Sequence, residues 1–454
     1  MGMQRKSALP TPRWTHLIQA IRKRIFSQSF LSRHRKRPEC FTRKRVLPFA
    51  VVVLLLLQKT TRSVQRHLND FLEALWPEDE VSATDGAWTQ ARAKLGHGAF
   101  TELNQDVLLP EFYAPAQAAY RRTWKGHRLL GGDGSDLRLP SHPEIFQSFP
   151  KLDVTNQHGQ TGTSYAPARL SVLYDLLNHV GLDASLAPIT QSEIDLLSAQ
   201  LEYVQPNDIL IWDRGFTGFV LMAQTRARQA HFIGRCSTAS FATAQELFRL
   251  NRAGRSQRVK IFAARQHHAY LKELGLQTEL IVRFVSLRLP SGELEVLVTS
   301  LLDEDVYPTQ EFLQVYDWRW NHETYHLMLK GRLDLENWTG QTEEAVRQDV
   351  QAAILISNLE TLLSQEVQEE LSTGDAERQY PAQVNRSNSY HALKEHILDL
   401  LWSKSPVERA IRRIQRGMST KPVSINSNRK PPARKPTSPH RSYQYQRNQK
   451  KTVF

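Results

Sequence analysis

The sequence predicts a mixed α/β fold with an all-α N-terminal domain and a β-rich insertion. Three patterns indicate it. Apolar residues recur at helical spacing over the first 95 residues, strand and helix patterns alternate between residues 129 and 226, and strand patterns dominate residues 231–305. Alternating strands and helices are typical of a mixed sheet with flanking helices.

The first 95 residues are predicted to form helices with short connections. Near the N-terminus, apolar side chains recur three or four positions apart, at Trp14, Leu17, Ile18, Ile21 and Ile25. Further helices are expected at residues 48–59, 63–76 and 86–95.

Two features of this region indicate whether it contacts a membrane or DNA. The apolar run Val46–Leu57 is shorter than the roughly 20 residues that span a bilayer, so we expect a buried helix and no membrane partner. The last helical stretch carries Arg92 and Lys94, which we expect to lie against DNA. The same pattern also suits a three-helix core that does not bind DNA.

The middle of the chain is predicted to form the sheet. Strands are expected at residues 129–139, 170–176 and 208–213, a loop at 156–164, and helices at 190–201 and 215–226. The insertion contributes strands at 259–263, 278–287 and 293–299, and helices resume at 310–329 and 343–373.

These patterns divide the chain into seven segments. They are a basic N-terminal segment (1–45), a helical DNA-binding domain (46–125), the first part of the sheet domain (126–230), the β-rich insertion (231–308), the second part of the sheet domain (309–375), a C-terminal helical region (376–417) and a disordered basic tail (418–454).

The charge distribution indicates a polyanionic partner. Residues 1–50 hold 13 Lys/Arg and one acid, and residues 411–454 hold 12 Lys/Arg and no acid. The remainder carries 34 basic and 45 acidic residues, so its net charge is −11. Basic ends on an acidic centre fit a polyanion that the termini bind and a carboxylate-rich middle processes, although basic tails also aid solubility.

The two cysteines exclude some classes of protein. Cys40 and Cys236 belong to no CxxC pair, so the sequence predicts neither a disulfide framework nor a cysteine-based zinc site. This usage is typical of the reducing cytoplasm, where we expect the protein to act.

The segment from residue 316 to residue 330 is the most informative in the chain. It places four residues at offsets of 0, 3, 7 and 14, namely Tyr316, Arg319, Glu323 and Lys330. At about 100° per residue these occupy about 60° of one helix surface, which we call the helical stripe. The alternative is a solvated face with ion pairs, but the apolar neighbours Leu313, Trp320 and Leu327 favour burial.

Two aspartates upstream are candidates to complete a metal site with Glu323. Asp133 lies among glycines in a predicted strand, and Asp213 follows a short apolar strand. Carboxylate oxygens suit Mg²⁺ or Mn²⁺, and two such ions can promote phosphodiester chemistry. An aspartate after a strand is more often a turn or cap residue. Three other carboxylates remain alternatives at this point: Asp136, Asp175 and Asp208.

The spacing Tyr316-(2)-Arg319-(3)-Glu323-(6)-Lys330 resembles the Tyr-Arg-Glu-Lys motif of bacterial DDE transposases of insertion-sequence family four. Asp133-Gly-Ser, followed by Leu137-Arg-Leu-Pro140, resembles the first aspartate motif of that family, and Asp213-Arg-Gly-Phe resembles the second. The resemblance covers roughly residues 40–400.

The resemblance implies an RNase H-like catalytic core with an inserted β domain. It also implies a DNA-bound homodimer that recognises terminal inverted repeats and performs cut-and-paste transposition into target DNA. Asp133, Asp213 and Glu323 would then bind the metal, two Mg²⁺ or Mn²⁺ ions. Tyr316, Arg319 and Lys330 would contact DNA phosphates.

Some relatives stack a flipped base on a tryptophan of the insertion, and residues 213–317 contain no Trp. Phe262, Tyr270 and Phe284 are candidates to replace it. Two alternative functions remain, an RNase H-like nuclease that cuts without joining and a non-transposing DNA-binding relative.

Overall fold

The structure is a computed structural model that describes residues 11–43, 46–60, 62–155, 161–374 and 378–425. It divides into two compact units, which we call the helical unit (Met1–Ala114 with Leu329–Phe454) and the sheet unit (Pro115–Met328). Most of the predicted loop at 156–164 and of the predicted disordered tail lies outside the described residues.

The helical unit combines segments from both ends of the chain. Its helices are α1 (Thr15–Ile25), α2 (Gln28–His34), α3 (Phe49–Gln58), α4 (Val64–Leu75), α5 (Asp85–Arg92), α6 (Gly98–Glu102), the π-helix η1 (Leu103–Leu108), α7 (Leu109–Tyr113), α15 (Glu343–Thr373), α16 (Arg386–Glu395), α17 (Ile397–Leu401) and α18 (Val407–Met418). A short ribbon pairs β10 (Ala382–Gln383) with β11 (Val423–Ser424).

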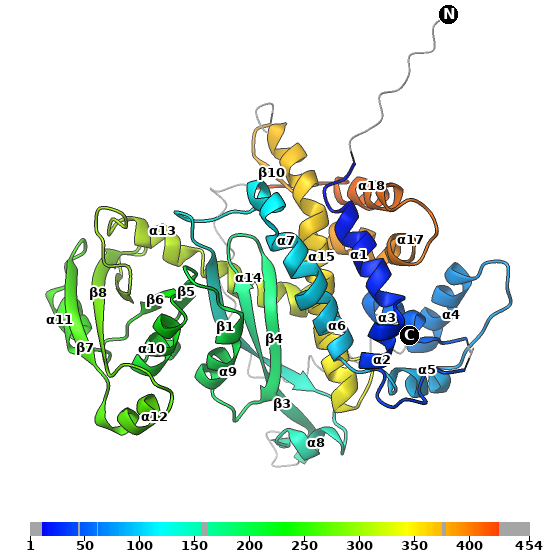
Figure 1. Cartoon of the computed structure of the whole chain (residues 1–454), viewed down its shortest axis with the longest axis horizontal. Helices are drawn as coiled ribbons and strands as arrows, with labels where there is room; N and C mark the ends of the chain where they lie inside the picture. The colour runs from blue at the N-terminus through cyan, green and yellow to red at the C-terminus, as the bar shows by residue number, and fades with distance from the viewer. Residues whose placement is uncertain (1–10, 44–45, 61, 156–160, 375–377, 426–454) are drawn as a thin grey trace, which may run out of the picture. The chain divides into compact units, whose positions relative to one another are not determined.

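The long helix α15 forms the centre of this unit (Figure 1), where it packs against α3, α6, α16 and α18. The apolar run of α3 is buried along nearly its whole length, as predicted, and so is the apolar series of α1. None of the helices in the described part of the chain is long and apolar enough to cross a membrane. The two units differ from the domain division predicted from the sequence. Helix α15 belongs to the helical unit, whereas the prediction placed it in the second part of the sheet domain.

The sheet unit holds nine strands in one sheet. They are β1 (Leu129–Leu139), β2 (Leu152–Thr155), β3 (Thr161–Asp175), β4 (Val180–Pro188), β5 (Ile209–Trp212), β6 (His231–Arg235), β7 (Ser256–Phe262), β8 (Glu279–Arg288) and β9 (Leu294–Thr299). The helices are η2 (Pro115–Tyr120), α8 (Ile145–Ser148), α9 (Glu193–Gln200), η3 (Leu201–Tyr203), η4 (Arg214–Phe216), α10 (Phe219–Ala227), α11 (Ala242–Leu250), η5 (Arg265–His267), α12 (His268–Glu273), α13 (Glu311–Asp317) and α14 (Trp320–Gly331).

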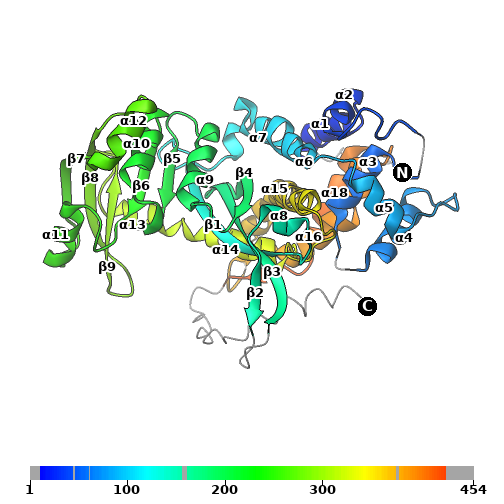
Figure 2. The same ribbon diagram turned by 90° about the horizontal axis from the view of Figure 1, so that it is seen from below.

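The strand order is β2-β3-β1-β5-β6-β9-β8-β7, and β4 pairs with β3. Strands β1, β5 and β6 are mutually parallel, whereas β3 and β9 run antiparallel to their neighbours. The hairpin of β2 and β3 extends beyond the other strands (Figure 2). The predicted insertion strands β7, β8 and β9 exist, but they do not form a separate domain, because β9 pairs with β6 and continues the sheet.

The predicted helix at 310–329 is two helices. Helix α13 ends at Asp317 and α14 begins at Trp320, with a turn at Trp318 and Arg319. The N–H groups of Asn321 and His322 donate to carbonyl oxygens three residues earlier, so the chain tightens at this point. The helical stripe is therefore interrupted at its second residue.

Candidate functional site

The two predicted aspartates lie just beyond the paired segment of two adjacent parallel strands. Gly131 is the last residue of β1 that pairs with β5, opposite Ile211; Asp133 is two residues further along β1, and Asp213 directly follows β5, which ends at Trp212. Side chains at matched positions of parallel strands point to the same face, and neighbouring strands are about 4.8 Å apart. Strand pairing thus brings two carboxylates that are 80 residues apart in the chain to the same end of neighbouring strands. Together with Glu323 we call them the carboxylate row.

Helices α13 and α14 bring three residues of the helical stripe to this row. The hydroxyl of Tyr316 donates to Oδ1 of Asp213 at 3.3 Å, and Nη2 of Arg319 donates to Oε1 of Glu323 at 2.9 Å. The Arg319 guanidinium also interacts electrostatically with Asp133 and Asp213, so one cation faces all three carboxylates. The turn between α13 and α14 holds Arg319 6% exposed, although its neighbour Trp320 is 50% exposed.

The environments of the two aspartates differ. Burial raises the pKa of Asp133 to about 6, despite the hydrogen bond that its carboxylate accepts from the Gly134 N–H. For Asp213, burial also acts to raise the pKa, but the Arg214 N–H, Arg319, Arg235 and Tyr316 outweigh it and lower the pKa overall. The Asp133 carboxyl group is therefore the harder of the two to ionise, and nearby positive charge favours its ionised form.

Arg235 extends the row and was not identified from the sequence. Trp212 of β5 is opposite Gly234 of β6, so Asp213 is followed on the next strand by Arg235. Its Nη1 lies 3.5 Å from Asp213 Oδ1, and its Nε donates to Glu295 Oε1 at 2.7 Å. A charged residue at the end of a short buried strand is the signal that could have found it.

The structure separates the alternative carboxylates from the row. Asp175 is fully buried and accepts from the N–H groups of Leu177 and Asn178, so it stabilises a turn. Asp208 is buried beside Arg128, whose Nε donates to it at 2.9 Å. Asp136 is on β1 but an odd number of residues from Asp133, so it lies on the opposite face of the sheet.

Arg92 is not placed to contact DNA, contrary to the prediction. It is 3% exposed, and its guanidinium donates to Gln348, Thr339, Ala345 and Asp349 within the helical unit. The helical pattern around residue 92 gave no information on this, because the partners are some 250 residues away. Lys94 is partly exposed, so its predicted DNA contact stays a prediction.

Other predictions about the site also change. Trp320 and Leu327 are 50% and 71% exposed, so they do not bury the helical stripe as their apolar character predicted. Lys330 lies in the last turn of α14, but in the helical unit, and its predicted phosphate contact stays a prediction. Phe284 is fully buried and cannot stack on a base, whereas Phe262 and Tyr270 are exposed.

The donor chemistry of the row suits a hard divalent cation, because Asp133, Asp213 and Glu323 offer only carboxylate oxygens. Within the described residues, however, no three acidic, histidine or cysteine side chains are gathered closely enough to hold one ion together. Arg319 supplies the positive charge that faces the carboxylates. Binding an ion to all three would require the Arg319–Glu323 pair to open.

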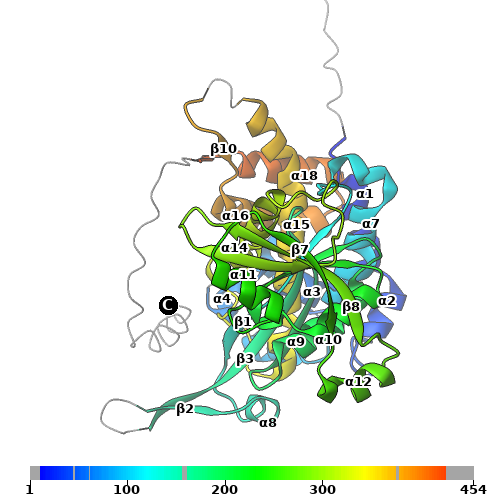
Figure 3. The same cartoon turned by 90° about the vertical axis from the view of Figure 1, so that its left-hand side faces the viewer.

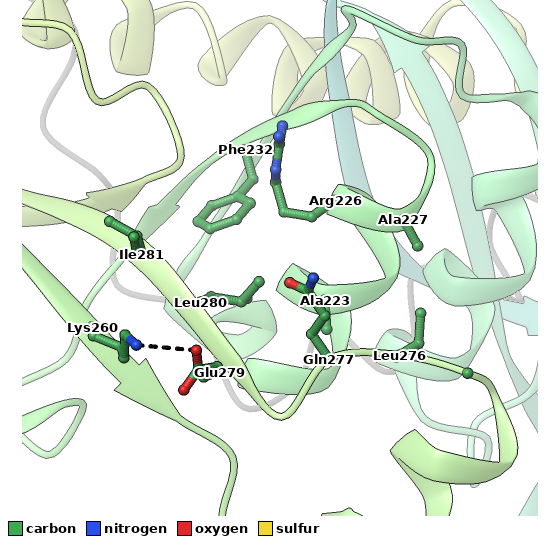
Figure 4. A pocket seen from close by; sticks show the side chains of 11 residues that line it. Ala223, Arg226, Ala227, Phe232, Lys260, Leu276, Gln277, Glu279, Leu280 and Ile281 are labelled. Carbon is green, nitrogen blue, oxygen red and sulfur yellow. Dashed lines mark hydrogen bonds and ion pairs between the residues drawn. The ribbon is translucent and has the colours of Figure 1, made fainter.

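A separate cavity of about 560 Å³ lies between α10 and strands β7 and β8 of the sheet unit (Figure 4). Arg226, Phe232 and Leu280 are among its lining residues, and none of the three candidate carboxylates is. We therefore place the candidate site at the carboxylate row and not in this cavity.

The chain resembles known proteins. A family described as "Transposase DDE domain" matches residues 124–359. The protein named "Putative transposase InsZ" from Escherichia coli (strain K12) is 28% identical over 179 residues, 38% of this chain and 56% of that protein, so the chain spans little more than half of that relative. The cryo-EM structure of a piggyBac transposase synaptic complex with hairpin DNA aligns with a TM-score of 0.44 and 12% identity over 90% of this chain and 87% of that chain.

Proposed function

The chain belongs to the transposase DDE domain family, which matches just over half of its 454 residues, and we propose that it is a metal-dependent DNA transposase that cleaves and joins DNA strands. We assign it to the group of insertion-sequence family four on its Tyr-Arg-Glu-Lys spacing. The order β4-β3-β1-β5-β6, antiparallel and then parallel, supports an RNase H-like core.

One observation carries this proposal. Asp133 and Asp213 lie just beyond the paired segment of β1 and β5, and the buried Arg319, which pairs with Glu323, interacts electrostatically with both aspartates. Burial of several charges is costly unless each has a partner, so such a row is rarely retained for stability alone. A cluster of acidic groups held near one buried cation is instead suited to exchange that charge for a ligand.

Each residue of the row has a role in this proposal. Asp133, Asp213 and Glu323 would hold two Mg²⁺ or Mn²⁺ ions, which when bound activate a water or 3′-hydroxyl and stabilise the departing oxygen. Arg319 would leave Glu323 and bind phosphate oxygens as a fork, with Lys330 as a second cation. The buried Nε of Arg319 has no hydrogen-bond partner among the described residues, so it has a donor to offer. Tyr316 would orient Asp213 or donate to a phosphate.

We further propose that the N-terminal helices bind the terminal inverted repeats, and that two copies of the chain act together on the DNA in the bacterial cytoplasm, at the nucleoid. The basic helices α1 and α2 and the partly exposed Lys94 support a DNA contact in this region. Analytical ultracentrifugation with and without duplexes that carry the repeats would test the dimer.

The test uses duplexes that carry the genomic sequence flanking the gene, incubated with Mg²⁺ or Mn²⁺ and a supercoiled target plasmid. Asp213→Asn and Glu323→Gln should each lower strand cleavage by at least about 10³-fold, because each removes an ionised ligand whose loss costs several kcal/mol. Binding of the duplexes should change little.

Asp136→Asn is the matched control, since it removes a carboxylate from the other face of the same strand. It should cleave within a few-fold of the wild type. Cleavage without joining of the 3′-hydroxyl end to the plasmid would identify a nuclease, and binding without any cleavage by the wild type would identify a DNA-binding relative. Equal losses for Asp136→Asn and Asp213→Asn would contradict the assignment of the site.

A further inference from the structure

Residues 247–272 of the sheet unit are unusually basic. They hold seven Lys/Arg and no Asp or Glu. All seven are exposed, and together we call them the β7 surface: Arg249, Arg252, Arg255, Arg258, Lys260, Arg265 and Lys272. They follow the chain from the last turn of α11 through β7 to α12.

Strand β7 is the last strand of the sheet (Figure 3), and among the described strands none pairs with its other edge. Its seven residues span about 20 Å at 3.3 Å per residue. Alternation along the strand puts Arg258, Lys260 and Phe262 on the same face, and Phe262 is 65% exposed. With α11 before the strand and α12 after it, the cations extend along this edge of the unit.

Most of these cations have no counter-charge. Within the described residues only Lys260 pairs with a carboxylate, Glu279 at 3.0 Å (Figure 4). The other six have no ion pair there. Arg258 is also near the buried Arg283 and acts to lower its pKa. A folded protein that only needed solubility would intersperse acids among these positions, so the retained positive field favours an anionic partner.

A basic edge strand can also serve to prevent pairing between sheets of two molecules. That role requires charges on the strand itself, which Arg258 and Lys260 provide. It does not explain the cations on α11, on the loop before β7 and on α12, nor the exclusion of acids from 26 consecutive residues. The pattern instead fits a surface that tracks a chain of phosphates.

We propose that the β7 surface binds the phosphate backbone of duplex DNA, independently of sequence. The exposed aromatic rings of Phe262 and Tyr270 lie among the cations, an arrangement common on nucleic-acid-binding surfaces. Binding itself does not require cleavage. Only the statement that this duplex is also a substrate of the carboxylate row rests on the proposed function.

The β7 surface is separate from the carboxylate row. Four strand spacings, β5 to β6, β9, β8 and β7, place it about 19 Å from β5, the strand that Asp213 directly follows. This corresponds to about six base pairs of B-DNA at 3.4 Å per step. The two sites therefore contact different phosphates, either further along one duplex or on a second one.

The experiment measures the affinity of the full chain for a random-sequence duplex between 50 and 200 mM salt. The triple variant R252Q/R255Q/R258Q removes three exposed cations without an ion pair. Each lost phosphate contact reduces the salt slope, the slope of log affinity against log salt concentration, by about 0.9. For three lost contacts, the affinity advantage of the wild type over the variant should therefore shrink about 40-fold between 50 and 200 mM salt. The control K125Q/K151Q/R347Q removes the same charge from cations that pair with Glu311, Asp153 and Glu343. It should leave the slope within one unit of the wild type.

An unchanged slope in the β7 triple variant, or an equal reduction in the control, would refute the proposal. Circular dichroism verifies that both variants fold, which is expected because the substituted side chains are on the surface. The result is independent of the proposed transposase activity, since Asp213→Asn should bind the random duplex like the wild type. The wild type could fail to cleave DNA while the β7 triple variant shows the expected reduction of the salt slope. That result would support DNA binding by the β7 surface and contradict the proposed catalytic function.

Discussion

Substitution of Arg92 by methionine tests whether this residue is buried in the protein, as the structure has it, or contacts DNA, as the sequence predicted. Arg92 is 3% exposed and donates to Gln348 Oε1 at 3.0 Å, to Thr339 Oγ1 at 2.7 Å and to Asp349 Oδ1 at 3.2 Å. Asp349 is itself 1% exposed. Methionine keeps much of the volume but removes the guanidinium that donates to these buried acceptors.

The expected loss in the free energy of unfolding is about 3–4 kcal/mol. Removing one partner of a buried ion pair typically costs about 3–5 kcal/mol, because the other charge stays buried without compensation. The lower part of this range applies here, since Asp349 keeps the Thr339 N–H at 2.8 Å and Lys59 Nζ at 3.7 Å. The double variant Arg92→Met/Asp349→Leu should lose less than the sum of the two single variants.

Urea denaturation of the full chain, followed by circular dichroism, measures these losses, and a duplex titration measures DNA binding. Lys94→Met is the matched control, since this neighbouring cation is partly exposed and should change stability by no more than about 0.5 kcal/mol. Under conditions where both variants are folded, Arg92→Met should bind DNA like the wild type. A loss of DNA affinity without a change in the urea midpoint would show that Arg92 contacts DNA and that its burial is wrong.

Three further predictions follow from single residues. Arg319→Ala should reduce strand cleavage about 10- to 100-fold, because a charged hydrogen bond to phosphate contributes about 1.5–3 kcal/mol. In the same assay Arg319→Lys should keep only part of the wild-type cleavage rate, since lysine has no planar fork. Gly132→Ala should destabilise the sheet unit by about 1–3 kcal/mol in urea, because the added Cβ would lie 2.3 Å from Leu197 Cδ1 on α9, and Leu197→Ala in the same chain should relieve part of that cost. Burial lowers the pKa of His67 from 6.5 to about 4, so the unfolded chain binds more protons between these values and stability should fall as the pH drops from 6.5 to 4; a His67→Leu variant that showed the same pH dependence in urea would refute this origin.

Much of the local structure could be predicted from the sequence, because apolar periodicity and turn residues act over a few positions. The bounds of β1 and α15 agree with the predicted ranges, and α3 is the buried helix that its uninterrupted apolar run indicated. The break between α13 and α14 was missed, since the helical spacing continues through Trp318 and Arg319 and only the hydrogen bonds reveal the turn.

The sequence by itself determined many of the helices and strands and which residues have the chemistry of a metal site, because these depend on side-chain type and short-range spacing. Only the tertiary structure decided that Asp133 and Asp213 come to the same end of β1 and β5, that Arg235 lies beside Asp213, and that Arg92 is buried. Strand register and burial depend on partners 80 or more residues away, and a shift of one residue would turn every side chain to the other face. Local periodicity carries no information about such partners.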